Sequence, residues 1–117
     1  MRKTYRYKNL SFPAGDDEEV RFTVEFVSDG NMGHTVVDVP TGRDPEIEDE
    51  GTESLGKGKN LRNSPTVSFS DISNAVPEED FIRINYKIND RILVRHENEK
   101  AEEDRPYIVL TIDFPKK

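Results

Sequence analysis

Three acidic runs, at positions 16–19, 44–53 and 97–104, are the part of the sequence best suited to binding a ligand. Calcium takes about six to eight oxygen ligands, and loops rich in aspartate and glutamate can supply them. If a metal binds, we expect calcium, held by residues drawn from Asp16, Asp17, Asp44, Glu46 and Asp49. None of the runs has the spaced Asp-x-Asp-x-Asp-Gly pattern of a calcium loop. The alternative is that they are solvated loops that keep the protein soluble.

The sequence offers little for catalysis. It has no cysteine and only two histidines, His34 and His96, neither of which lies in a motif. His34 and Asp38 would share one face of a strand because they are four residues apart, but the alternative is an ordinary polar strand face. Residues 55–62 place glycines between lysines without the spacing of a phosphate-binding loop. We therefore predict that the protein is not an enzyme and needs no cofactor.

Charge and hydropathy limit the partners and the location. The net charge of −7 argues against binding to nucleic acid or to an anionic membrane, since both require a basic surface. No apolar run is long enough to span a bilayer. The basic start of the sequence is not followed by the apolar region of a signal peptide. We expect a cytoplasmic location, or a place in an assembly made in the cytoplasm.

Alternation of apolar and polar residues predicts β-strands rather than helices. The pattern is clear at 20–26, 82–88 and 108–114, and weaker at 5–12, 35–39, 67–69 and 92–94, which gives about seven strands. Asp29-Gly30-Asn31-Met32-Gly33 and Asn89-Asp90 each lie between strands and supply residues that tolerate positive φ. Both segments are typical of hairpin turns.

These elements predict a single all-β domain over residues 1–117. We expect an antiparallel β-sandwich of about seven strands with immunoglobulin-like topology, and a small β-barrel is the alternative. The segment 40–65 is rich in glycine, proline and acidic residues and is expected to be one long loop. Such a loop is unusual, because connections in compact domains typically have about 4–6 residues.

A small sandwich without a catalytic set is typical of a structural or protein-interaction module, and we expect it to be a component of a larger assembly. Exposed edge strands give such a module a way to bind a protein partner or a second copy by strand addition. The basic, aromatic first strand (1–8) and the last strand (107–117) are the expected contact elements. The alternative function is binding of calcium or a small ligand by the acidic loops.

Overall fold

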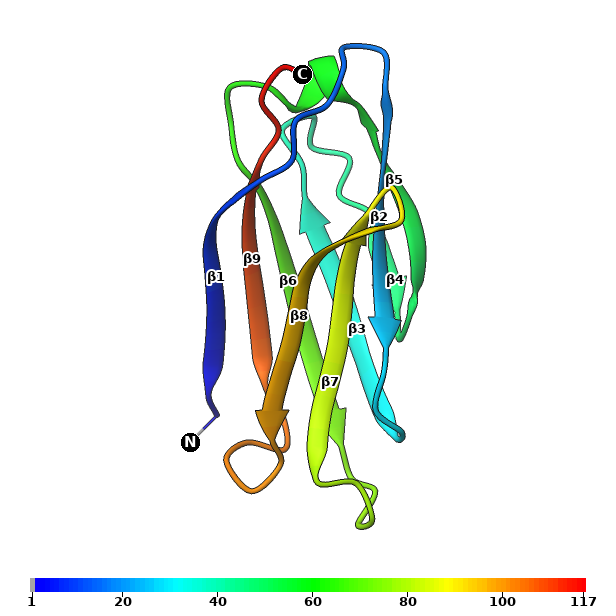
Figure 1. The fold of residues 1–117 in the computed structure, drawn as a ribbon, viewed down its shortest axis with the longest axis vertical. Coiled ribbons are helices and arrows are strands. Elements are labelled where there is room, and N and C mark those ends of the chain that lie inside the picture. Colours follow the sequence, from blue (N-terminus) through cyan, green and yellow to red (C-terminus); the bar gives the residue numbers. More distant parts are fainter. Residues whose placement is uncertain (1) are drawn as a thin grey trace.

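The computed structural model describes residues 2–117, which form nine β-strands and one short 3-10 helix (Figure 1). The elements are β1 (Thr4–Ser11), β2 (Glu19–Phe26), β3 (Asn31–Asp38), β4 (Glu46–Glu48), β5 (Gly51–Lys57), η1 (Gly58–Leu61), β6 (Thr66–Asn74), β7 (Phe81–Ile88), β8 (Arg91–Glu99) and β9 (Tyr107–Asp113). All seven predicted strands are present. Over residues 2–117, no helix is long and apolar enough to cross a lipid bilayer.

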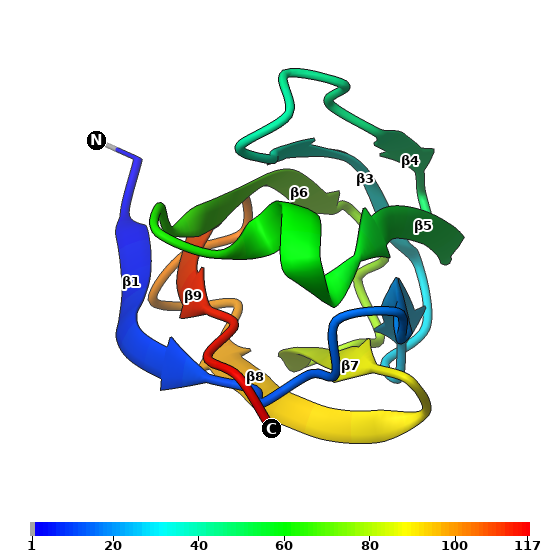
Figure 2. The ribbon, with the colours of Figure 1, turned by 90° about the horizontal axis from the view of Figure 1, so that it is seen from above.

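The strands form two sheets that face each other. One has five strands in the order β1-β9-β6-β3-β4, and the other has four in the order β5-β2-β7-β8. Viewed along the strands in Figure 2, β6 and β9 lie in one layer, with β7 and β8 across from them. β1 pairs with β9 in parallel, and the remaining strand pairs are antiparallel. The all-β, sandwich-like architecture is confirmed, but the prediction that both sheets are antiparallel is wrong, because the parallel pairing of β1 with β9 makes the five-stranded sheet mixed. The barrel alternative is also wrong, because the two sheets do not close on each other.

Apolar side chains from alternate strand positions fill the space between the sheets. In β2, Val20, Phe22 and Val24 point inward and are almost completely buried. The matching inward residues of β7 and β9 are Ile82, Ile84, Tyr86, Ile88, Ile108, Leu110 and Ile112. Removing this apolar area from water stabilises the fold by roughly 25 cal/mol per Å². The alternation in the sequence therefore identified the inner faces of these three strands.

The inner face of β6 is different, because small hydroxyl side chains line much of it. Thr66, Ser68 and Ser70 are all fully buried. Ser70 Oγ lies 2.8 Å from Thr35 Oγ1 of β3 and accepts a 2.9 Å hydrogen bond from the Tyr86 hydroxyl of β7. A chain of hydroxyl groups thus joins the two sheets through the core.

Thr66 and Ser68 suggest how the domain can be made more stable. Within residues 2–117, Thr66 Oγ1 and Ser68 Oγ have no hydrogen-bond partner although both atoms are buried. Thr66→Val removes a desolvated hydroxyl and keeps the side-chain shape, so it should raise the free energy of unfolding by about 1 kcal/mol. Urea unfolding measures the change. Thr35→Val is the control and should lower stability because it breaks the bond to Ser70. A destabilised Thr66→Val variant would contradict the prediction.

The composition of segment 40–65 predicted one long loop, and this prediction is wrong. It contains β4, β5 and η1. Ile47 and Leu55 point into the core, with exposed fractions of 3% and 4%. Asp49, with φ of 55°, lies in the turn that leads from β4 in one sheet to β5 in the other. The sequence did not predict β4 as a strand because an alternation of apolar and polar residues needs several buried positions, and β4 buries a single residue.

Of the two predicted hairpins, one is confirmed. Asn89 and Asp90 both have positive φ, 48° and 66°, and connect the paired strands β7 and β8. The turn around Gly30, with φ of 80°, instead joins β2 in one sheet to β3 in the other. A hairpin does not form there because the chain after β2 continues along β7, with the Val27 amide donating to the Arg83 carbonyl at 2.9 Å.

Candidate interaction surfaces

The outer face of the four-stranded sheet is polar, and many of its side chains pair with one another. Glu25 of β2 bonds to Lys87 of β7 at 3.0 Å, and Arg83 bonds to Glu97 of β8 at 2.6 Å. The Thr23 and Thr52 hydroxyls lie 2.7 Å apart. The polar groups of this face thus bond to one another, and a face of this polarity is typical of a surface that contacts water.

The outer face of the five-stranded sheet carries an apolar stripe. Val36 of β3, Phe69 of β6 and Val109 of β9 lie side by side, because Val36 pairs with Phe69 and Phe69 pairs with Val109 in the strand register. Val109 is only 5% exposed but does not belong to the core between the sheets. The Phe69 ring lies 6.4 Å from the Tyr107 ring on the same face. The stripe is therefore a second apolar cluster, packed on the outside of the sheet.

The two ends of the apolar stripe carry opposite charges. Arg6 of β1 pairs with Val109, and Glu46 of β4 pairs with Val36. A single row of residues thus crosses all five strands in the order Arg6, Val109, Phe69, Val36, Glu46. Both charged residues are exposed. The β1 side of this face is basic, the β4 side is acidic, and the middle is apolar.

His34 neutralises part of the acidic side. Its Nδ1 lies 2.6 Å from Glu48 Oε1, and its Nε2 lies 2.9 Å from Glu46 Oε1. Both ring nitrogens therefore donate, which requires the protonated imidazolium. The hydrogen bond to Glu48 is the main reason that the pKa of His34 is raised above its ordinary value. The pairing partners are Glu46 and Glu48, and not Asp38 as the four-residue spacing had allowed.

The predicted calcium ligands lie apart and contact other groups. Asp16 accepts from Arg62 at 3.0 Å, and Asp17 lies 3.6 Å from the Lys59 ammonium, both beside η1. The other predicted ligands also have partners within the protein. Asp44 accepts a hydrogen bond from the Val39 amide, Asp49 accepts one from the Gly33 amide, and Glu46 contacts His34. Within residues 2–117, no three histidine, aspartate or glutamate side chains are placed to hold a metal ion. Calcium binding stays a prediction.

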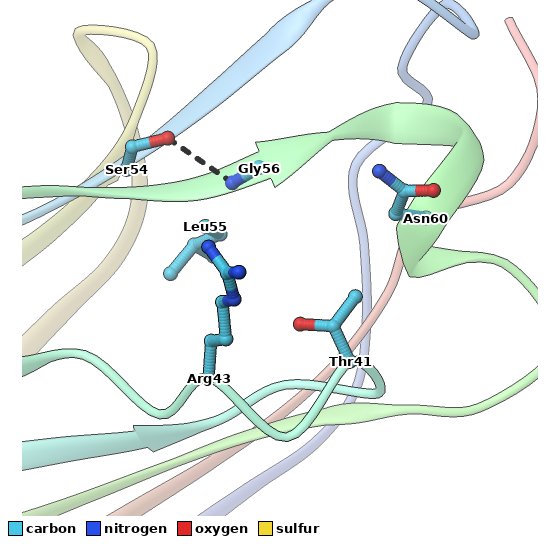
Figure 3. Close-up of a pocket in the computed structure, with 6 residues that line it drawn as sticks. All are labelled: Thr41, Arg43, Ser54, Leu55, Gly56 and Asn60. Atoms are coloured by element: carbon cyan, nitrogen blue, oxygen red, sulfur yellow. Dashed lines mark hydrogen bonds between the residues drawn. The ribbon is translucent and has the colours of Figure 1, made fainter.

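Two surface hollows have room for a small molecule. A groove of about 740 Å³ lies between the end of β1 and the start of β8, lined in part by Phe12, Ile92 and Leu93. A hollow of about 340 Å³ lies between the β3–β4 connection and β5–η1 (Figure 3). Its six lining residues are Thr41, Arg43, Ser54, Leu55, Gly56 and Asn60. None of these six is acidic, so this hollow does not suit a cation.

The termini contribute one edge strand and one interior strand. β1 is an edge of the five-stranded sheet, as expected, with Arg6 and Lys8 exposed and Tyr7 packed against the core. β9 lies between β1 and β6 and is paired on both sides. The expectation that the last strand offers a free edge is therefore wrong.

A buried polar cluster around His96 was missed by the sequence reasoning. His96 of β8 is 1% exposed, with Nδ1 2.7 Å from the Tyr7 hydroxyl and Nε2 2.7 Å from Asn98 Oδ1. Asn98 Nδ2 donates to the carbonyls of Glu99 and Glu103, so its Oδ1 faces the histidine. Nε2 therefore carries the proton and Nδ1 accepts from Tyr7. The alternation of Val94, His96 and Asn98 was the signal for this inward face.

No protein-family model matches the chain, and a search of curated proteins finds no match. The function is therefore inferred from the chemistry and geometry of these surfaces alone.

Proposed function

We propose that the chain is a non-enzymatic protein-interaction module that joins a larger assembly through the outer face of its five-stranded sheet. The apolar stripe of Val36, Phe69 and Val109 is the observation that carries this proposal. Val109 is nearly buried beneath its neighbours, whereas Val36 and Phe69 are partly exposed and supply the apolar surface. Exposed apolar groups rimmed by polar residues mark protein-binding surfaces. The polar outer face of the opposite sheet shows that this architecture tolerates an outer face of charged and hydroxyl side chains.

The edge strands support the proposal less well than the face does. On β1, the register with β9 shifts between Tyr7 and Leu10, and Asn9 has a φ of 61°. Such a bulge, together with the exposed charges of Arg6 and Lys8, discourages the addition of a further strand. β4 has three residues and offers little backbone for pairing. Association through the sheet face is the mode that these features favour.

The environments of the histidines support a non-enzymatic function. His96 is enclosed by the sheets, so its ring cannot reach a bound substrate. His34 is exposed, but both of its ring nitrogens contact glutamate carboxylates, so neither is free to contact a substrate proton.

We further propose that the topology is immunoglobulin-like. The order β9-β6-β3-β4 follows the G-F-C-C′ order of a variable-type immunoglobulin sheet, and β5 lies beside β2 as strand E lies beside strand B. The β7–β8 hairpin is then an addition on the other side of β2. An experimental structure in which β2 and β5 do not pair would contradict this assignment.

A photo-crosslinking amino acid placed on each outer face tests the interaction function. In cells that naturally produce the protein, a crosslinker at Phe69 should yield covalent adducts whose other component is identified by mass spectrometry. The matched control places the crosslinker at Thr23, on the polar face of the other sheet. Adducts formed at Phe69 and not at Thr23 would support the proposal. Equal adduct formation at the two positions, or none at either, would overturn it.

A further inference from the structure

Given the interaction function proposed above, on which this step depends, we infer that the apolar stripe binds a second copy of this chain. The two copies would pack face to face through their five-stranded sheets, related by a two-fold axis that runs parallel to the strands and passes over β6. A symmetric dimer requires a surface that is complementary to itself. The row from Arg6 to Glu46 has that property.

The symmetry of the row is visible in the register. Phe69 lies on β6, the central strand of the five, with Val109 and Arg6 on one side and Val36 and Glu46 on the other. Rotation about an axis along β6 exchanges the two sides. It places Arg6 opposite the second copy's Glu46, Val109 opposite its Val36, and Phe69 opposite its Phe69. The partly exposed Phe69 rings then meet each other, Val36 covers the nearly buried Val109 of the other copy, and each basic end meets an acidic end.

Charge selects this axis over the other face-to-face arrangement. A two-fold axis in the same plane but perpendicular to the strands would place Arg6 opposite the other copy's Arg6 and Glu46 opposite its Glu46. Like charges facing each other across an interface are unfavourable. With the axis along β6, Asp71 lies opposite Asp71 of the second copy. In each copy, however, Asp71 accepts a hydrogen bond from the Arg2 guanidinium.

The face has a suitable size for such a dimer. Strands in a sheet are about 4.8 Å apart and rise about 3.3 Å per residue, and the five strands have 35 residues together. They therefore cover roughly 550 Å² in projection. A stable interface of ordinary size buries about 800 Å² of accessible surface per partner. Side chains increase the accessible area above the projected area, so the face approaches this size. Sheets pack face to face at a separation of about 10 Å, which interdigitating side chains fill.

Reversing the charge of Arg6 or of Glu46, at the two ends of the row, tests the inference. We would measure the mass of the purified protein by light scattering after size exclusion, over a range of concentrations. The wild type should be in monomer–dimer equilibrium. Arg6→Glu and Glu46→Arg should each weaken the dimer at least tenfold, because each places like charges together at two symmetric contacts. A mixture of the two variants should form a heterodimer, since both contacts then join opposite charges. Arg95→Glu, on the exposed outer face of β8, is the control and should behave as the wild type.

Every outcome bears on the dimer. Recovery of dimers in the mixture would support the face, the partner and the axis together. A wild type that stays monomeric at all concentrations, or single variants that dimerise like the wild type, would overturn the inference. Crosslinks from Phe69 to a different protein would also overturn it while leaving the interaction function intact. Absence of specific crosslinks from Phe69 would count against the interaction function itself.

Discussion

Replacing Tyr86 with alanine is expected to lower the free energy of unfolding by about 3–5 kcal/mol. Tyr86 is completely buried on β7, with its ring 6.0 Å from the Phe22 ring of β2. Removing the ring leaves a cavity between the sheets and also removes the donor to Ser70. In domains of about 60–250 residues each kcal/mol lowers Tm by about 2–8 °C, so we expect a large fall in the Tm of the variant.

Tyr86→Phe separates the ring from its hydroxyl. This variant keeps the apolar packing and removes one hydrogen bond, while Ser70 retains its contact with Thr35. We expect a loss of about 1 kcal/mol. Urea unfolding of the three proteins measures both terms. If phenylalanine were as damaging as alanine, the hydroxyl chain would dominate the stability at this position, and the packing interpretation would be wrong.

Replacing His96 with alanine is the second large effect, a loss of about 2–4 kcal/mol at pH 7. The variant would leave the Tyr7 hydroxyl and the Asn98 carbonyl without the ring nitrogens that they contact. It would also remove the ring against which the Tyr5 ring packs edge-on at a centroid distance of 4.9 Å. The loss should open the side of the sandwich where β1 lies near β8. Denaturant unfolding measures the loss, and a change below about 0.5 kcal/mol, which is usual for surface positions, would contradict it.

His96 should also make the fold sensitive to acid. Burial lowers the pKa of His96 below its ordinary value. Below about pH 6.5 the unfolded chain binds a proton that the folded chain does not, so stability falls as the pH decreases toward the folded pKa. His34 has the opposite effect. Its raised pKa gives a contribution that is complete below about pH 6.5 and is lost as the pH rises through the folded value.

The two histidines can be separated in a His34→Gln background. Between pH 7.5 and 5.5, the remaining decrease in stability should come from His96 and should disappear on further replacement of His96 with glutamine. Glu18, Glu25, Glu102 and Glu103 have lowered pKa values, so their contributions are lost only at lower pH. Two-dimensional NMR of the wild-type rings gives an independent check. The His34 midpoint should lie above the ordinary histidine value, and the His96 midpoint below it.

Much of the fold could be predicted because three strands bury one face of alternating apolar residues. β2, β7 and β9 have this pattern and were recognised almost to their ends. β6 and β8 were recognised only in part, because their inner faces carry Ser68, Ser70, His96 and Asn98. The polarity of these residues resembles that of a solvent-exposed face. Only the tertiary structure supplies the partners that allow most of them to be buried.

The candidate interaction face could not be predicted, because it depends on strand order. Val36, Phe69 and Val109 are 33 and 40 residues apart in the sequence, and the register alone brings them into one row. The two turns illustrate the same limit. Asn89-Asp90 could be read locally, since its strands pair directly with each other. Whether the chain after Gly30 returns to its own sheet or crosses to the other depends on the position of β7.

The pairing of β1 with β9 has a consequence for how the chain is made. Tyr5 pairs with Ile108, so after β1 has left the ribosome about another hundred residues must be synthesised before its partner strand is available. Long-range pairing of this kind slows folding. Exposed basic side chains such as Arg6 and Lys8 discourage an unpaired strand from pairing with neighbouring chains. The five-stranded sheet is completed last, when residue 113 emerges and β9 inserts between β1 and β6.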